Sequence, residues 1–88
     1  MLYAKLLKNG VALKGLSLNQ ICFQLAKRDI WLDRAVLSKM KNGKLPPAKD
    51  HINIALAEIL GIDSNELRLA AARETIDPKL YELIRCAG

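Results

Sequence analysis

Aromatic residues and long apolar runs are scarce in this chain of 88 residues. It contains one Trp, one Phe and two Tyr. No apolar run approaches the about 20 residues that a membrane-spanning helix needs, and the first residues lack the charged-then-apolar layout of a signal peptide. We therefore expect neither a membrane protein nor a secreted one. The length allows a single domain over residues 1–88.

Cysteine and histidine are too few and too scattered to suggest a metal centre. Cys22 and Cys86 lie far apart, outside any CxxC motif or Cys/His cluster. This usage is typical of reduced thiols in a cytoplasmic protein. His51 is the only histidine and is expected on a helix surface. We expect no metal site.

Signatures of catalysis are also missing. The chain has no Gly-rich phosphate loop, no nucleophile elbow and no HExxH motif. Its Asp and Glu residues are scattered, and many stand where helices are expected to begin. We therefore predict that the protein is not an enzyme and needs no cofactor.

Positive charge is concentrated in the first half of the chain. Residues 1–49 hold ten Lys and Arg and two acidic residues, a net charge of +8, whereas residues 50–88 carry −3. A charged run is usually only a solvated surface, but a split of this size within one small domain is less common. It favours a polyanionic partner for the first half, with nucleic acid ahead of a lipid surface.

Apolar residues recur with helical spacing along almost the whole chain, which predicts an all-α bundle of five to six short helices. A first helix contains Leu2, Leu6 and Leu7 and is expected to be interrupted at Gly10. The Ser17–Gln20 segment has the form of a capping box, which predicts a second helix from about 18 to 27.

Helix start and stop signals divide the rest of the chain. Asp33 is a suitable N-cap for a third helix, which Asn42 and Gly43 end. The next helix ends at Gly61, and Asp63 and Glu66 form a second capping box. A last helix is predicted over about 78–86. Trp31 precedes the third helix and is expected to cover the core.

The stretch 16–67 resembles the Cro/CI-type helix-turn-helix family, also called XRE-like regulators. Residues 16–22 (LSLNQIC) are similar to the opening of that family's second helix. Residues 37–44 (LSKMKNGK) resemble the end of its recognition helix, and 56–63 (LAEILGID) its fourth helix. The resemblance implies a lambda-repressor-like fold and binding of double-stranded DNA. It also implies a transcriptional regulator that acts most simply as a repressor.

The resemblance also implies roles for individual residues. Reading the major groove needs a helix with long polar side chains near its N-terminus. The predicted base-reading residues are Arg34, Ala35, Ser38 and Lys39, with Arg34 as the main reader. The predicted phosphate-binding residues are Asn19, Gln20, Lys41 and Lys44, and Gln20 is equally suited to its capping role.

One spacing departs from the family. The segment between Cys22 and Leu37 is several residues longer than is typical. The extra residues fit either a longer second helix or a loop that carries Trp31.

Two partner predictions complete the analysis. Small regulators of this resemblance usually dimerise through C-terminal elements, and the predicted dimer residues are Leu80, Tyr81, Leu83 and Ile84. The alternative function is a protein-binding module, such as an antitoxin that masks a toxin, with DNA binding secondary. The candidate protein partners are a toxin or an anti-repressor.

Overall fold

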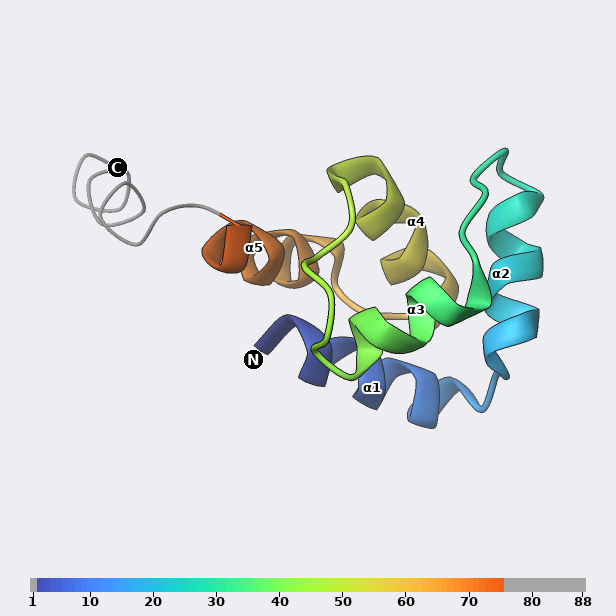
Figure 1. Cartoon of the computed structure of the whole chain (residues 1–88), viewed down its shortest axis with the longest axis horizontal. Coiled ribbons are helices and arrows are strands. Elements are labelled where there is room, and N and C mark those ends of the chain that lie inside the picture. The colour runs from blue at the N-terminus through green and yellow to red at the C-terminus, as the bar shows by residue number, and fades with distance from the viewer. Residues whose placement is uncertain (1, 76–88) are drawn as a thin grey trace.

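The computed structural model describes residues 2–75, which form five α-helices and contain no β-strand (Figure 1). This arrangement confirms the predicted all-α fold. The predicted last helix and its dimer residues Leu80, Tyr81, Leu83 and Ile84 lie outside the described residues, as does Cys86. The helices are α1 (Leu2–Lys14), α2 (Leu18–Ala26), α3 (Arg34–Lys41), α4 (Asp50–Leu60) and α5 (Ser64–Thr75).

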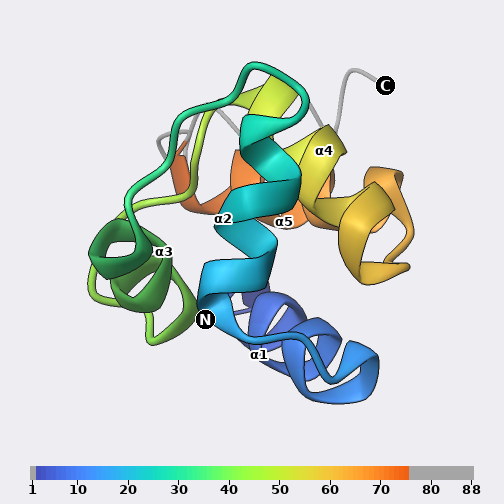
Figure 2. The ribbon, with the colours of Figure 1, turned by 90° about the vertical axis from the view of Figure 1, so that its right-hand side faces the viewer.

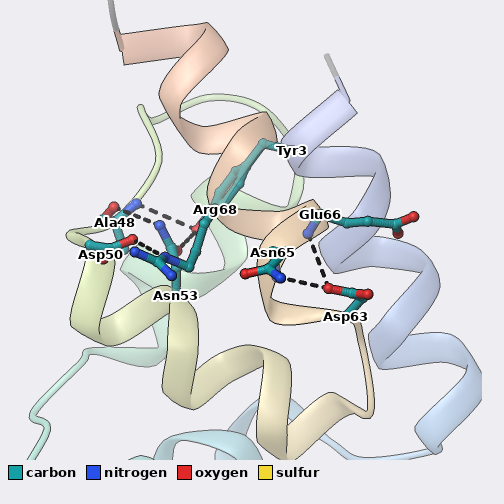
Figure 3. A network of polar contacts seen from close by, with 8 residues as sticks. All are labelled: Tyr3, Ala48, Asp50, Asn53, Asp63, Asn65, Glu66 and Arg68. Carbon is teal, nitrogen blue, oxygen red and sulfur yellow. Dashed lines mark hydrogen bonds and ion pairs between the residues drawn. The ribbon is translucent and has the colours of Figure 1, made fainter. Parts of the chain in front are cut away.

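Local capping explains where α2, α3 and α5 begin. The Ser17 hydroxyl accepts a hydrogen bond from the Gln20 amide (3.1 Å), and the Gln20 side chain accepts one from the Ser17 amide (2.8 Å). These two bonds complete the predicted capping box. The Asp33 carboxylate accepts from the second amide of α3. Asp63 accepts from the amides of Asn65 (2.8 Å) and Glu66 (3.3 Å) at the start of α5 (Figure 3).

Two glycines end helices where the sequence predicts that they do. Gly61 terminates α4 in the left-handed conformation, with φ of 72°. Gly43 follows the C-cap Asn42 of α3 and has φ of 74°, while Asn42 itself keeps a negative φ. A side chain at either glycine would be strained, because L-residues other than glycine rarely adopt this conformation.

The prediction that Gly10 interrupts the first helix was wrong. Gly10 is buried within an unbroken α1 that continues to Lys14. A Cβ atom added there would come within 2.5 Å of the Ile62 side chain and 3.3 Å of Leu60 Cβ. The glycine therefore lets α1 approach the turn between α4 and α5 closely, and this packing offsets its low helix propensity.

The hydrophobic core is built around α4, which packs against α5, α2 and α1, while α1 also packs against α3. Figure 1 shows α5 at one end of the long axis and α2 at the other. The buried apolar side chains come from all five helices: Tyr3, Leu7, Ile21, Leu25, Leu37, Met40, Ala55, Leu56, Ala57, Ile59, Leu60, Leu67, Ala70 and Ala71.

A buried polar network joins α1 to α4 and to the connection before α4 (Figure 3). The Tyr3 hydroxyl donates to Asn53 Oδ1 (2.5 Å) and accepts from the Ala48 amide (3.4 Å). Asn53 Nδ2 donates to the Ala48 carbonyl (2.9 Å). Burial raises the pKa of Tyr3 to about 12. The network therefore holds the residue that follows Pro46 and Pro47 in a defined place.

Candidate nucleic-acid interface

The two helices of the predicted DNA-binding motif are consecutive and packed against each other. Seen from the α2 end of the molecule, α2 stands upright and α3 is viewed nearly along its axis (Figure 2). The helices therefore run across one another. Residues 27–33 connect them, and α2 ends at Ala26. The extra residues noted in the sequence thus form a loop and do not extend the second helix.

Burial of one side of α3 turns its other side outward. Leu37 and Met40 are only 1% and 2% exposed, as the sequence predicts. Among the predicted base-reading residues, Arg34, Ala35 and Lys39 are exposed and Ser38 is half-buried. The four residues therefore stand on the side of α3 that a partner can reach.

A shallow hollow joins this side of α3 to the first turn of α2. It is lined by Leu18, Asp33, Arg34, Ala35 and Ser38, and we call it the α3 hollow. Leu18 is the first residue of α2, so the hollow places the N-terminus of α2 beside three of the four predicted base-reading residues.

The surroundings of the Cys22 thiol reflect the same contact between α2 and the start of α3. Its pKa is raised, mainly by burial and further by the nearby Asp33 carboxylate, while Arg34 acts in the opposite direction. Cys22 lies one helical turn after Leu18. The side of α2 that carries these two residues therefore faces the start of α3.

The predicted phosphate-binding residues lie on two separate elements. Asn19 and Gln20 are exposed in the first turn of α2, and the Gln20 side-chain oxygen is engaged in the capping box. Lys41 is half-buried at the end of α3, and Lys44 is exposed just beyond it. The Lys44 amide donates to the Lys39 carbonyl (2.8 Å), which fixes the turn that carries the Lys44 side chain.

In the part of the chain that the structure describes, the cations of α3 and its following turn form no ion pair with a carboxylate. Within residues 2–75, the side chains of Arg34, Lys39, Lys41 and Lys44 make no ion pair or hydrogen bond. In the same part of the chain, Arg28 pairs with Glu58 across the α2–α4 packing, and Arg68 donates to Asp50 (2.8 Å). Without such pairs, these four cations are available to attract an anionic partner.

The prediction that Trp31 covers the core was wrong. Its side chain is 82% exposed on the connection between α2 and α3. Ile30 and Leu32, on either side of it, pack against the core instead. Because its two neighbours are packed on the core, the Trp31 side chain points away from it. His51, by contrast, is exposed on α4 as predicted.

The sequence analysis did not predict a cation–aromatic contact between Lys27 and Phe23 at the end of α2. Lys27 Nζ lies 4.8 Å from the centre of the Phe23 ring, and Phe23 is 62% exposed. The spacing of four residues, which brings side chains together on a helix, was the signal available. The contact places an exposed aromatic ring beside a lysine at the C-terminal end of α2.

Comparisons of the chain with protein families, curated proteins and solved structures gave no match. Among the described residues, no helix has both the length and the apolar character that crossing a bilayer requires.

Proposed function

We propose that the chain is a sequence-specific DNA-binding transcriptional regulator, most simply a repressor, that reads an operator in the major groove as a dimer. The α3 hollow is the observation that carries this proposal. It unites the N-terminus of α2 with Arg34, Ala35 and Ser38 on the outward side of α3. The unpaired cations along α3 and its following turn would supply attraction for phosphates.

Base reading is assigned to the outward side of α3. An α-helix fits the major groove, where each base pair presents its own pattern of donors and acceptors. The guanidinium of Arg34 stands in the first turn of α3 and suits a bidentate contact with guanine. Ala35 suits contact with a thymine methyl group. Ser38 and Lys39 follow one turn later on the same side.

Phosphate binding is assigned to the start of α2 and to the end of α3 with its following turn. At the start of α2, the capping box occupies the Gln20 amide, while the amides of Leu18 and Asn19 come before the first helical hydrogen bond. Such amides, together with the helix dipole, favour an anion. Lys41 and Lys44 would hold the backbone beyond the other end of α3. Contacts at both ends would set the position of α3 in the groove.

The proposal is tested by fluorescence anisotropy with a labelled duplex from the region upstream of the gene and with a random duplex. Titrations at several salt concentrations between about 50 and 200 mM give the number of phosphate contacts from the slope. A specific regulator should bind its operator about 1,000-fold or more tightly than the random duplex.

Single substitutions separate the two kinds of contact. Arg34→Ala should reduce the preference between sequences by about tenfold or more, as expected for the loss of a bidentate contact. Lys44→Ala should weaken binding to both duplexes about equally and lower the salt slope by about one per protomer. Arg68→Ala is the matched control, since it removes an exposed guanidinium on α5, where it pairs with Asp50.

Three results would contradict the proposal. An unchanged preference after Arg34→Ala would refute the assignment of base reading. Equal, weak binding to both duplexes by the native chain would show that the cationic surface attracts DNA without regard to its sequence. No binding at low salt would favour the alternative function of a protein-binding module.

A further inference from the structure

A groove beside α3, separate from the α3 hollow, is framed by the two connections that lead into and out of that helix. Both connections extend from α3 on the side of α4 (Figures 1 and 2). The first turn of α4 completes the lining. The apolar side chains that line the groove include Trp31, Val36, Leu45 and Pro46. We call this surface the Trp31 groove.

The Trp31 groove and the α3 hollow lie on opposite flanks of α3. Each residue advances about 100° around a helix axis. Val36, which lines the groove, therefore stands on the other flank from Arg34 and Ser38, which line the hollow. Lys39 is exposed and stands between the two flanks. The outward side of α3 is thus bordered by a depression along each edge.

The major groove of B-DNA has a sugar–phosphate backbone along each of its two edges. It is about 12 Å wide, close to the diameter of an α-helix with its side chains, so a helix seated in it lies against both DNA strands. In the proposed complex, the first turn of α2 stands beside one strand, at the α3 hollow. The other strand then runs along the opposite flank of α3, where the Trp31 groove lies.

The chemistry of the groove suits a sugar–phosphate backbone. Deoxyribose presents apolar C–H groups, and phosphate presents anionic oxygens. The Trp31 side chain is 82% exposed and offers an apolar ring face together with an N–H donor. Lys49 lines the groove, and Lys44 directly precedes its lining residue Leu45; within residues 2–75 neither lysine side chain makes an ion pair or hydrogen bond. The two cations outnumber Asp29, the one carboxylate among the lining residues.

The connection between α2 and α3 holds Trp31 in place before any partner binds. At one end the Ile30 amide donates to the Leu25 carbonyl (3.0 Å), and at the other end Asp33 caps α3. Ile30 and Leu32 pack against the core on either side of Trp31. Because the backbone is already fixed, little conformational freedom is lost when the exposed indole makes a contact.

We propose that the Trp31 groove binds the second DNA strand beside α3, with the Trp31 ring packed on a deoxyribose and its N–H donated to a phosphate oxygen. Lys44 and Lys49 bind phosphates of the same strand. The long connection between α2 and α3 thereby contributes affinity and not base reading, since the sugar–phosphate backbone carries no base sequence. This inference rests on the proposed function, because it requires DNA at α3.

Tryptophan fluorescence tests the contact directly, because Trp31 is the only tryptophan of the 88-residue chain. Emission is quenched with acrylamide, which is uncharged and is therefore not repelled by DNA as iodide is. The measurement is made without DNA and with a saturating amount of the random duplex at about 50 mM salt, where binding to phosphates is strong. The quenching constant should fall about twofold or more on addition of the duplex, because the ring becomes covered.

Substitutions measure what the contact contributes to binding. Trp31→Ala should weaken binding to the upstream and random duplexes by about tenfold each, with their ratio kept within about twofold. Trp31→Phe keeps an apolar ring but loses the N–H, so binding should weaken by about threefold. Phe23→Ala is the matched control and should bind like the native chain, since Phe23 is 62% exposed on α2 and lines neither the groove nor the α3 hollow. Circular dichroism and urea midpoints confirm that each variant is folded.

The outcomes separate this inference from the proposed function. Quenching that the duplex leaves unchanged, or a Trp31→Ala variant that binds as tightly as Phe23→Ala, would overturn the inference, and a preference for the upstream duplex would still support the proposed function. Shielding of Trp31 and weaker binding of Trp31→Ala, without a preference between the duplexes, would support the contact and refute sequence-specific regulation. Failure to bind either duplex at low salt would overturn both.

Discussion

Replacing Tyr3 with Phe removes one hydroxyl from the centre of the buried polar network and should lower the free energy of unfolding by about 2 kcal/mol. The ring is 1% exposed, so its apolar packing is kept in the variant. The hydroxyl donates to Asn53 Oδ1 at 2.5 Å and accepts from the Ala48 amide at 3.4 Å. The first bond is short and enclosed, whereas the second is long.

The size of the effect follows from what the substitution leaves behind. Asn53 is 1% exposed, so its oxygen would lose its partner in a place that water does not readily reach. Leaving a buried acceptor unsatisfied costs about 1–3 kcal/mol, and the longer bond to Ala48 adds little. A loss of about 2 kcal/mol is large for a small domain, whose total stability is about 5–15 kcal/mol.

Alkaline pH provides a second measurement on the same hydroxyl. The pKa of Tyr3 is raised from 10.0 to about 12, chiefly because burial disfavours the phenolate. Above pH 10 the unfolded chain therefore loses this proton first, and the folded state becomes less stable relative to it. The stabilisation, which is about 3 kcal/mol at most, is complete below pH 10 and is lost as the pH rises through about 12.

Urea unfolding followed by circular dichroism, at pH values between about 8 and 12, measures both effects. At the lower pH values the native chain should exceed Tyr3→Phe in stability, and the difference should shrink as the pH rises. The two proteins differ only at residue 3, so the difference between the two curves isolates Tyr3. Equal stability at pH 8, or parallel curves up to pH 12, would refute the reasoning.

Three further predictions concern the packing of α1, the cap of α2 and the α2–α3 connection. Gly10→Ala should lower the free energy of unfolding by about 1 kcal/mol, because the clash with Ile62 exceeds the gain in helix propensity. The control Asn9→Ala, at the exposed neighbouring position, should be neutral or slightly stabilising in the same urea experiment. Ser17→Ala should cost about 1 kcal/mol by removing the capping bond, and a variant as stable as the native chain would contradict that role. Trp31 should emit and be quenched by iodide nearly as in the unfolded chain, because it is 82% exposed, and a protected indole would refute its placement.

Much of the candidate site could be predicted because it depends on local signals. The capping box at Ser17 and the N-cap Asp33 determine where α2 and α3 begin, and the periodicity of Leu37 and Met40 determines which side of α3 is buried. Once these are known, the exposure of Arg34 follows. The capping bond also shows that the Gln20 oxygen serves the helix start, a point that the sequence left open.

Other features of the site depend on how distant segments meet. The sequence showed that extra residues separate Cys22 from Leu37, but two arrangements could absorb them. In the structure the extra residues form a loop, in which Ile30 and Leu32 pack on the core and Trp31 is exposed. The α3 hollow likewise needs α2 and α3 to run across one another, which no residue pattern within either helix specifies.

The sequence by itself determined where α2, α3 and α5 begin and where α3 and α4 end, because caps, glycine turns and apolar periodicity act over a few neighbouring residues. Only the tertiary structure decided that Gly10 belongs inside α1 and that Tyr3 bonds Asn53, since both depend on segments about 50 residues apart in the chain. It also decided that Trp31 and Pro46 line one groove. The physical reason is that local hydrogen bonding sets where a helix begins and ends, whereas packing between helices sets which side chains meet.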